Sequence, residues 1–557
     1  MSNKKILQQN KKAEAATKIK RQIIDIYSKL MVDVDLFPSI MDLHDAGVSR
    51  EKWRHYFRSL NNLRAETRVV YPHLFSGAIA EKDTVLYTDK AKKALSGKKR
   101  FFITAAISGQ RVFSEGLESV RSWQKKKNGG IIILPSLDTA HNLDNEIEWH
   151  FDAELLKLPL LFGGLSLNSN FRISDYFVTA KQINPLTGIG RHVQKKGSMI
   201  FGSPKQSLEY ESVSNASKYP NAGMSSGAIT LPNYKTSKGN AMRTAWIATN
   251  DHVMGGVIVE IENDKVYHFR QVQFDQNGGF CDVDGNYYLG KKVHKIESYF
   301  KKSPEMVRGD IHIGVEDKVA VATSNLLIKA LKIKTIAEND LFDGASCNHH
   351  IADDVIQQAA LSKKDRATIE DELAMVAKHL QDMLKITENV IVVPSNHDDF
   401  LARYLRKGSF IKDSRNFRIG CKLSDLMLEG KDPFVEGLRL SGVIKDFDKL
   451  VASGKLQFPD INDDIKFGVF NIVHGHIGRN GQRQPGLAGI EKGWGAAISG
   501  HSHTPGILRK VFRVGTLSQK RQGYNRGPSS WTHTDAIRYP NNQVQLINYI
   551  DGKYTIK

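Results

Sequence analysis

The spacing of apolar residues changes along the chain and predicts three regions. Residues 1–66 have the spacing of amphipathic helices. Residues 98–136 have the pattern of a strand, a helix and a strand, and residues 253–288 alternate like antiparallel strands. From about residue 305, short apolar runs alternate with long helical stretches, and each run ends in a polar cluster.

We therefore predict an α/β (α+β) chain. It divides into a basic helical region (1–95), a mixed α/β region to which no role is assigned (96–300) and a region with its site at the ends of strands (301–557).

The N-terminal region contains a helix, a tight turn and a second helix. Gly47 ends the first helix and Ser49 can cap the second. The second helix carries four cations beside its aromatic residues: Arg50, Lys52, Arg54 and Arg58. This pattern resembles a helix-turn-helix, which would place the four cations against DNA. An amphipathic helical hairpin with a solvated basic face has the same pattern, and the sequence leaves both interpretations open.

The charge of the chain favours a polyanionic partner. Its 557 residues include 79 Lys and Arg against 60 Asp and Glu, a net charge of +19. Cations that neutralise phosphates release counterions, so this excess favours nucleic acid, although a solvated basic surface gives the same total. No apolar run approaches the roughly 20 residues that cross a bilayer. The 3 cysteines have neither metal-knuckle nor disulfide-framework spacing. We predict a cytoplasmic protein that binds DNA and no membrane.

Five polar clusters follow predicted strands in the last region. Each offers oxygen or nitrogen donors at the point where a strand ends. In the first and the last cluster, donors two positions apart point to the same side of an extended segment. The clusters are Asp310-Ile311-His312, Asn339-Asp340-Leu341-Phe342-Asp343, Ser395-Asn396-His397-Asp398, His474-Gly475-His476 and Gly500-His501-Ser502-His503.

These donors predict a pair of divalent cations. Carboxylate, amide and imidazole donors without thiolates suit Mn, Fe, Zn or Co better than Ca. Asp340 stands at a strand end, where one carboxylate can bridge two ions. Two ions roughly 3.5–4 Å apart can hold a phosphodiester from both sides and activate a shared hydroxide for in-line attack. We therefore expect phosphodiester hydrolysis.

In this order the clusters resemble the motifs of the calcineurin-like metallophosphoesterases. The family's motifs are Asp-x-His, Gly-Asp-x-x-Asp, Gly-Asn-His-Asp/Glu, a His often followed by Gly, and Gly-His-x-His. Asn339 and Ser395 stand where the family has glycine, and both are turn positions rather than ligands. The opening Asp-Ile-His-Ile-Gly is most similar to the SbcD-type DNA-repair nucleases. For residues 301–557 the resemblance implies a four-layer β-sandwich flanked by helices.

The resemblance also assigns roles. It implies one ion held by Asp310, His312, Asp340 and His503, and a second held by Asp340, Asn396, His474 and His501. It places His397 near the leaving oxygen as a proton donor or charge stabiliser, with Asp398 orienting it. Mn²⁺ is the expected metal, with Mg²⁺, Fe²⁺, Zn²⁺ and Co²⁺ as alternatives.

The whole chain is similar to the nucleases with which virulent tailed phages degrade host DNA early in infection. That similarity implies a metal-dependent deoxyribonuclease in the cytoplasm of an infected bacterium. Self-association and an accessory protein are further expectations. Two alternatives stay open: a phosphatase or small-molecule phosphodiesterase of the same superfamily, and a DNA-binding regulator with an inert phosphoesterase domain. A phosphatase or small-molecule phosphodiesterase would not explain the charge of +19. An inert regulator would not explain why the set of ligands is complete.

Overall fold

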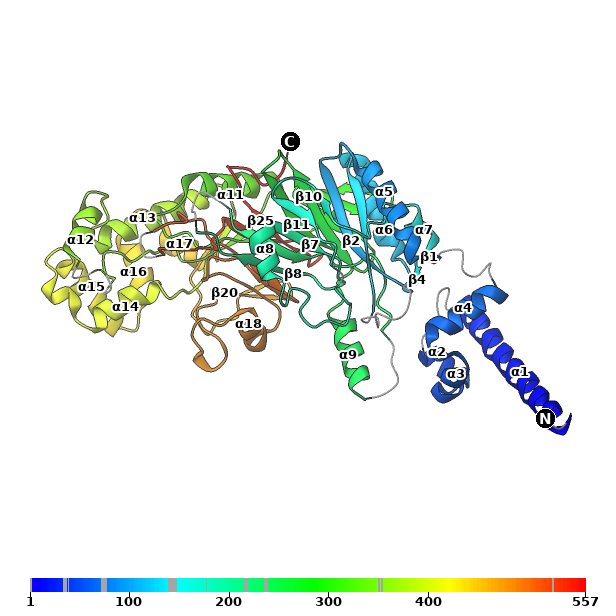
Figure 1. The fold of residues 1–557 in the computed structure, drawn as a ribbon. Coiled ribbons are helices and arrows are strands. Elements are labelled where there is room, and N and C mark those ends of the chain that lie inside the picture. Colours follow the sequence, from blue (N-terminus) through cyan, green and yellow to red (C-terminus); the bar gives the residue numbers. More distant parts are fainter. Residues whose placement is uncertain are drawn as a thin grey trace.

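The computed structural model describes residues 3–33, 38, 40–71, 78–138, 148–176, 178–214, 219–234, 239–348, 351, 354–522 and 525–556. Helices cover several sheets of mixed strand direction, which confirms the predicted α+β class (Figure 1). Among these residues, no helix combines the length and the apolar composition needed to cross a membrane.

A six-stranded sheet forms from the apolar runs of the last region. Its strands β15 to β18 are parallel, and β24 and β25 continue it in antiparallel fashion. Parallel strands are covered on both faces, which explains why these runs are apolar almost throughout. In spatial order the strands are β18 (Leu456–Gln457), β17 (Asn389–Val392), β16 (Thr335–Glu338), β15 (Glu305–Val307), β24 (Thr534–Arg538) and β25 (Val544–Asn548).

A ten-stranded sheet combines residues from two of the predicted regions. Strands β8 and β22 pair antiparallel, with Leu208 opposite Ile507. The predicted boundary near residue 300 therefore does not separate two sheets, and the division of the chain into regions stays a prediction. In spatial order the strands are β19 (Lys466–Phe467), β20 (Phe470–Val473), β21 (Ala497–Ser499), β23 (Val511–Arg513), β22 (Gly506–Leu508), β8 (Ser207–Glu211), β9 (Asn221–Ser225), β7 (Ser198–Phe201), β6 (Phe171–Ile173) and β5 (Leu165–Ser166).

The two sheets pack face to face and helices cover their outer faces. Val307 and Ala337 of the six-stranded sheet share a buried cluster with Ile472 and Ile498 of the ten-stranded sheet. On the outside of the six-stranded sheet, α11 (Lys318–Leu331) and α13 (Ile369–Met383) contribute to a second core. Helices α18 (Leu487–Trp494) and α8 (Gly190–Lys196) pack against the ten-stranded sheet. The order is helices, sheet, sheet, helices.

A four-stranded sheet lies beside this sandwich. The predicted strand, helix and strand at residues 98–136 are β2 (Arg100–Ile107), α6 (Ser114–Lys127) and β3 (Gly130–Ser136), with the two strands parallel. The predicted antiparallel pair is β10 (Gly255–Ile261) and β11 (Tyr267–Gln273). Strand β11 lies next to β25, so the four-stranded sheet lies beside the β25 edge of the six-stranded sheet. Helix α5 (Thr84–Leu95) adds Leu95 to the core between the sheets.

Short elements complete the first half of the chain. Strand β1 pairs with β4, and β12, β13 and β14 form a small antiparallel sheet. They are β1 (Ala78–Ala80), η2 (Glu81–Asp83), β4 (Glu148–His150), α7 (Ala153–Leu156), α9 (Gly239–Asn250), β12 (Phe280–Asp282), β13 (Asn286–Leu289), β14 (Lys292–Lys295) and α10 (Ile296–Tyr299).

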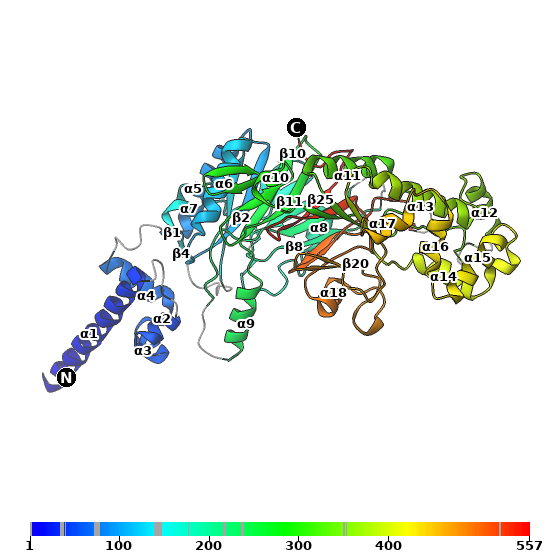
Figure 2. The ribbon, with the colours of Figure 1, turned by 180° about the vertical axis from the view of Figure 1, so that it is seen from behind.

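A group of helices extends the molecule beyond the six-stranded sheet (Figure 2). Several of these helices share their core with α13, through residues such as Leu401, Leu423 and Leu438. They are α12 (Val355–Ser362), α14 (Asp398–Arg406), η3 (Ser409–Lys412), α15 (Phe417–Leu428), α16 (Pro433–Leu440) and α17 (Phe447–Ala452).

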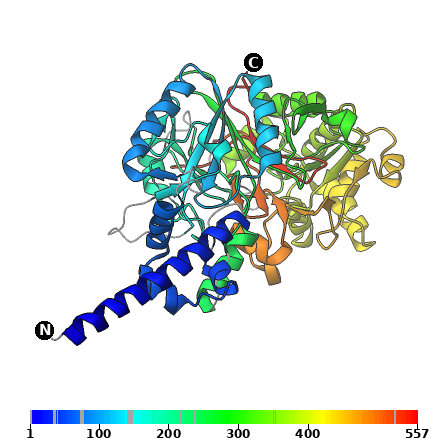
Figure 3. The ribbon, with the colours of Figure 1, turned by 90° about the vertical axis from the view of Figure 1, so that its right-hand side faces the viewer.

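The N-terminal helices form their own small bundle at the other end of the molecule. It consists of α1 (Asn3–Asp33), α2 (Ile40–Asp45), α3 (Arg50–Phe57) and α4 (Leu60–Val70). Tyr27, Trp53 and Leu63 meet in its core. Ser49 caps α3 by accepting from the Lys52 amide, as predicted, and α1 projects well beyond the bundle (Figure 3).

Candidate metal centre

The polar clusters meet where strands of both sheets end. Asp310, Asp340 and Asn396 follow β15, β16 and β17 of the six-stranded sheet, and His474 and His501 follow β20 and β21 of the ten-stranded sheet. Neighbouring parallel strands have their carboxyl ends at the same edge of a sheet. Packing of the six-stranded sheet on the ten-stranded sheet brings these two edges together. Residues as far apart in sequence as Asp310 and His503 therefore lie in contact.

The first group of donors is the one that the family resemblance implied for one ion. One donor atom from each of its members lies within 4.8 Å of the others, and all four residues are buried: Asp310, His312, Asp340 and His503. Nε2 of His503 lies 3.0 Å from Oδ2 of Asp310 and 3.2 Å from Nε2 of His312. His312 Nε2 is 3.6 Å from Oδ2 of Asp340. This group can hold a metal ion.

The second group shares Asp340 with the first. Donor atoms of Asp340, His474 and His501 also lie within 4.8 Å of one another. Nε2 of His474 is 3.3 Å from Oδ2 of Asp340 and 2.9 Å from the amide oxygen of Asn396. The predicted members of the second ion's ligand set are therefore adjacent, and Asp340 stands between the two sets.

Buried carboxylate oxygens in this cluster have chemistry that suits a cation. Oδ1 of Asp310 and Oδ1 of Asp340 are buried and accept no hydrogen bond within the described part of the chain. Such oxygens are costly to bury without a partner, and a divalent ion supplies one. Gly500 leaves room for the Asp310 carboxylate, because a Cβ there would lie 2.4 Å from its Oδ1. The oxygen and nitrogen donors thus fit a divalent metal.

The backbone of four candidate ligands is held in the left-handed region. Positive φ angles occur at His312 (52°), Asp340 (43°), His501 (72°) and His503 (57°). Non-glycine residues rarely adopt this conformation, and it persists where surrounding structure enforces it, as in binding sites.

The imidazoles of this cluster differ in the direction in which their pKa is shifted. Burial opposes charge on His474, but the carboxylates of Asp340 and Asp310 outweigh it and raise the pKa to about 9. Burial and the neighbouring His474 lower the pKa of His501 to about 4, and that of His476 likewise to about 4. His501 is therefore neutral at pH 7, the form in which an imidazole nitrogen binds a metal.

His397 lies at the edge of the first group. Its ring centroid is 4.6 Å from that of His312, and its Nδ1 lies 2.9 Å from the backbone carbonyl of Asp343. Asp398 was expected to orient this ring, but its carboxylate instead accepts from the Ser395 amide at 3.0 Å. The Asp343 carbonyl has the orienting position, because the loop after β16 passes closer to His397. Burial, together with Asp340, raises the pKa of Asp398 to about 8.

Comparison with known proteins gives one relative. No protein-family model matches the chain, and no solved structure matches it. The chain is similar to a phage protein. It is 29% identical over 352 residues to Protein A1 of Escherichia phage T5, and the match covers 59% of this chain and 59% of that relative's length. The chain thus spans less than two thirds of the relative that it matches.

Three neighbours of the cluster were not among the predicted site residues. His476 was visible in the His474-Gly475-His476 pattern, and its ring lies 5.3 Å from that of His474. Asn339 occupies a position where the family has glycine, and its amide oxygen lies 3.4 Å from Nδ1 of His474. Trp531 places its ring 4.1 Å from that of His503. Trp531 lies outside the five clusters, so no sequence signal singled it out.

The four predicted DNA contacts lie far from the metal cluster. Arg50, Lys52 and Arg54 are exposed on α3 and Arg58 is exposed at its C-cap, whereas Trp53 faces the bundle core. Figures 1 and 2 place α3 at one end of the molecule and α14, which follows His397, at the other. A partner that contacts both α3 and the candidate metal centre would have to extend along the molecule from one to the other.

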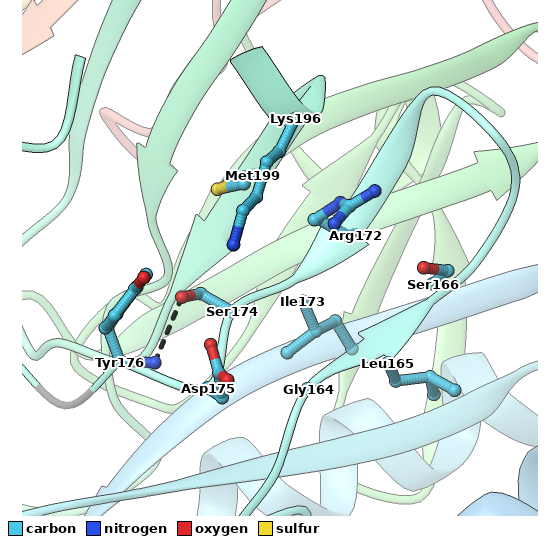
Figure 4. A pocket seen from close by; sticks show the side chains of 10 residues that line it. All are labelled: Gly164, Leu165, Ser166, Arg172, Ile173, Ser174, Asp175, Tyr176, Lys196 and Met199. Atoms are coloured by element: carbon cyan, nitrogen blue, oxygen red, sulfur yellow. Dashed lines mark hydrogen bonds between the residues drawn. The ribbon is translucent and has the colours of Figure 1, made fainter. Parts of the chain in front are cut away.

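A separate cavity of about 170 Å³ opens at the β5–β6 edge of the ten-stranded sheet (Figure 4). Arg172, Lys196 and Tyr176 contribute polar groups to its wall, and the Tyr176 amide donates to Ser174 Oγ. The predicted metal ligands do not line it.

Proposed function

We propose that the protein is a metal-dependent deoxyribonuclease that hydrolyses DNA phosphodiester bonds with a pair of divalent ions, of which Mn²⁺ is the best candidate. The observation that supports this proposal is the position of Asp340, whose carboxylate belongs to both donor groups. One group would hold the first ion and the other, completed by the Asn396 amide oxygen, the second. Bound divalent cations supply the positive charge that stabilises a phosphoryl group under attack.

The chain's own residues have distinct tasks in this proposal. The contact between Nδ1 of His397 and the Asp343 carbonyl fixes the imidazole ring and leaves Nε2 available to the leaving oxygen. His312 would be oriented from its far side by Asp343, whose Oδ1 lies 3.3 Å from Nδ1 of His312.

DNA is the proposed substrate because of the charge of the chain and its likeness to a phage protein. The net charge of +19 favours a phosphate backbone, and the exposed cations of α3 offer a second contact remote from the centre. The likeness to a phage protein supports a role in infection, in which the enzyme degrades host DNA in the bacterial cytoplasm. Self-association and an accessory protein belong to the same proposal.

One assay tests the activity. Purified chain is incubated with plasmid, linear duplex, single-stranded DNA and a phosphomonoester, in Mn²⁺ or in EDTA. We expect cleavage of DNA that EDTA abolishes, and we expect Asp340→Ala to lack it while the exposed Asp89→Ala retains it. Turnover of the monoester alone would favour a phosphatase, and retention of DNA without turnover would favour an inert regulator.

A further inference from the structure

Arg366 is a buried cation close to the metal cluster that none of the proposed steps uses. Its side chain is 3% exposed. One terminal nitrogen, Nη2, donates to Oδ2 of Asp343 at 2.5 Å and to Oε1 of Glu372 at 2.8 Å. A buried guanidinium shared by two carboxylates holds both in defined positions, since its planar geometry permits few alternatives.

Asp343 connects this cation to the centre. Its Oδ1 lies 3.3 Å from Nδ1 of His312, whereas Nε2 of the same ring faces the other donors. Its backbone carbonyl lies 2.9 Å from Nδ1 of His397. One loop residue therefore touches a candidate metal ligand and the candidate proton donor at the same time.

Glu372 connects the cation to α13. Its carboxylate accepts from the amides of Ala345 at 3.2 Å and Ser346 at 2.8 Å, and from the Ser346 hydroxyl at 2.6 Å. These bonds hold the loop that follows Asp343. The α13 helix is thus linked to the cluster through Glu372, Arg366 and Asp343.

The backbone near His312 lies in close contact with the side chain of Arg366. Gly314, two residues after His312, has a φ of +100°, and a Cβ there would lie 2.4 Å from Nε of Arg366. The guanidinium therefore packs directly on the ligand-bearing loop. Movement of Arg366 would shift both Asp343 and the segment that carries His312.

We propose that Arg366 is a positioning residue of the metal centre, acting through Asp343 to set the orientation of His312 and His397. The proposal rests on the proposed metal site. It adds that bonds from Asp343 through Arg366 to Glu372 of α13 hold the candidate ligands in position. Lysine at this position keeps the charge, but its ammonium sits on a flexible stem in place of the planar guanidinium, whose Nη2 bonds both carboxylates. Glutamine removes the charge and leaves the carboxylates of Asp343 and Glu372 facing each other without a cation.

The test measures metal binding directly. Mn²⁺ is titrated by calorimetry into the full chain carrying Arg366→Lys, Arg366→Gln, Asp343→Asn or the Arg366→Gln/Asp343→Asn pair. Residues that orient metal ligands typically change affinity 10–100-fold, so we expect losses of about 10-fold or more in the single variants, smaller for lysine than for glutamine. If Arg366 acts through Asp343, the double variant loses little more than Asp343→Asn alone.

A matched control separates positioning from general damage. Arg270 of β11 is equally buried and bonds to Glu260 of the neighbouring strand β10 and to Asp282 of β12. Arg270→Lys should lower thermal stability and leave Mn²⁺ affinity unchanged. If Arg366→Gln does not fold, the lysine variant and its double with Asp343→Asn decide the matter in the same way.

The outcomes distinguish this inference from the nuclease proposal. Unchanged Mn²⁺ affinity in folded Arg366 variants, or losses that simply add to that of Asp343→Asn, would overturn the positioning role. Wild-type chain that binds Mn²⁺ but cleaves no DNA would overturn the nuclease proposal alone. Wild-type chain that binds no divalent ion would overturn both.

Discussion

Oδ2 of Asp340 lies 3.3 Å from Nε2 of His474, and this contact joins the two sheets of the sandwich. Asp340 follows β16 of the six-stranded sheet, and His474 follows β20 of the ten-stranded sheet. A site formed across two sheets requires that both keep their relative position. Metal binding should therefore be sensitive to changes at this contact.

Replacing Asp340 should remove both ions. Asp340→Ala deletes the carboxylate that both donor groups share, so neither group retains its full set of ligands. Metal content after dialysis against Mn²⁺, measured by plasma emission spectroscopy, should fall to background. Asp89→Ala, an exposed substitution on α5, should leave the content unchanged. Normal occupancy in the Asp340 variant would falsify the bridging role.

His397 should matter for cleavage and not for metal content. It lies beside His312 but outside the two donor sets that share Asp340. Loss of a general acid typically costs about 10²–10⁴-fold in rate, and we expect His397→Ala to lower kcat in this range with Mn²⁺ still bound. The exposed His192→Ala serves as the control. A His397→Ala rate within a few-fold of wild type would exclude the proton-donor role.

The cations of α3 should contribute to DNA affinity at a distance from the chemistry. Each phosphate contact adds roughly one to the salt dependence of binding, so Arg54→Ala/Arg58→Ala should lower the slope of log Kd against log salt by about two. Hydrolysis of a small diester should not change. Lys92→Ala/Lys93→Ala on α5 removes the same charge from another surface and should leave the slope unaltered. An unchanged slope in the α3 variant would place DNA elsewhere.

His150 should make the fold sensitive to acid. Burial, with the positive charges of Arg64 and Arg68, lowers its pKa from 6.5 to about 2. Below about pH 6.5 the unfolded chain takes up a proton that the folded chain does not, so stability present above that pH is lost on acidification, by at most about 1.4 kcal/mol per pH unit. Urea midpoints at pH 7, 6 and 5 should therefore fall less steeply in His150→Gln than in wild type. Parallel slopes would show that His150 titrates normally.

The sequence by itself determined the kinds of elements and the identity of the candidate ligands. Apolar runs marked β15, β16 and β17, and the strand, helix and strand at β2, α6 and β3, because local periodicity follows which face of an element is buried. The five polar clusters stood out because each followed such a run. Their order resembled the motifs of a known family, and that resemblance indicated which side chains would meet.

Only the tertiary structure decided how distant segments combine. Pairing of β8 with β22 puts residues on both sides of position 300 into one sheet, and strand pairing between distant segments leaves no local signature. The same holds for His397, whose partner is the Asp343 carbonyl rather than the adjacent Asp398. Arg366 carries no motif, and its place beside Asp343 follows from the packing of α13 against the ligand loop. Contacts of this kind depend on three-dimensional packing, which residue spacing does not encode.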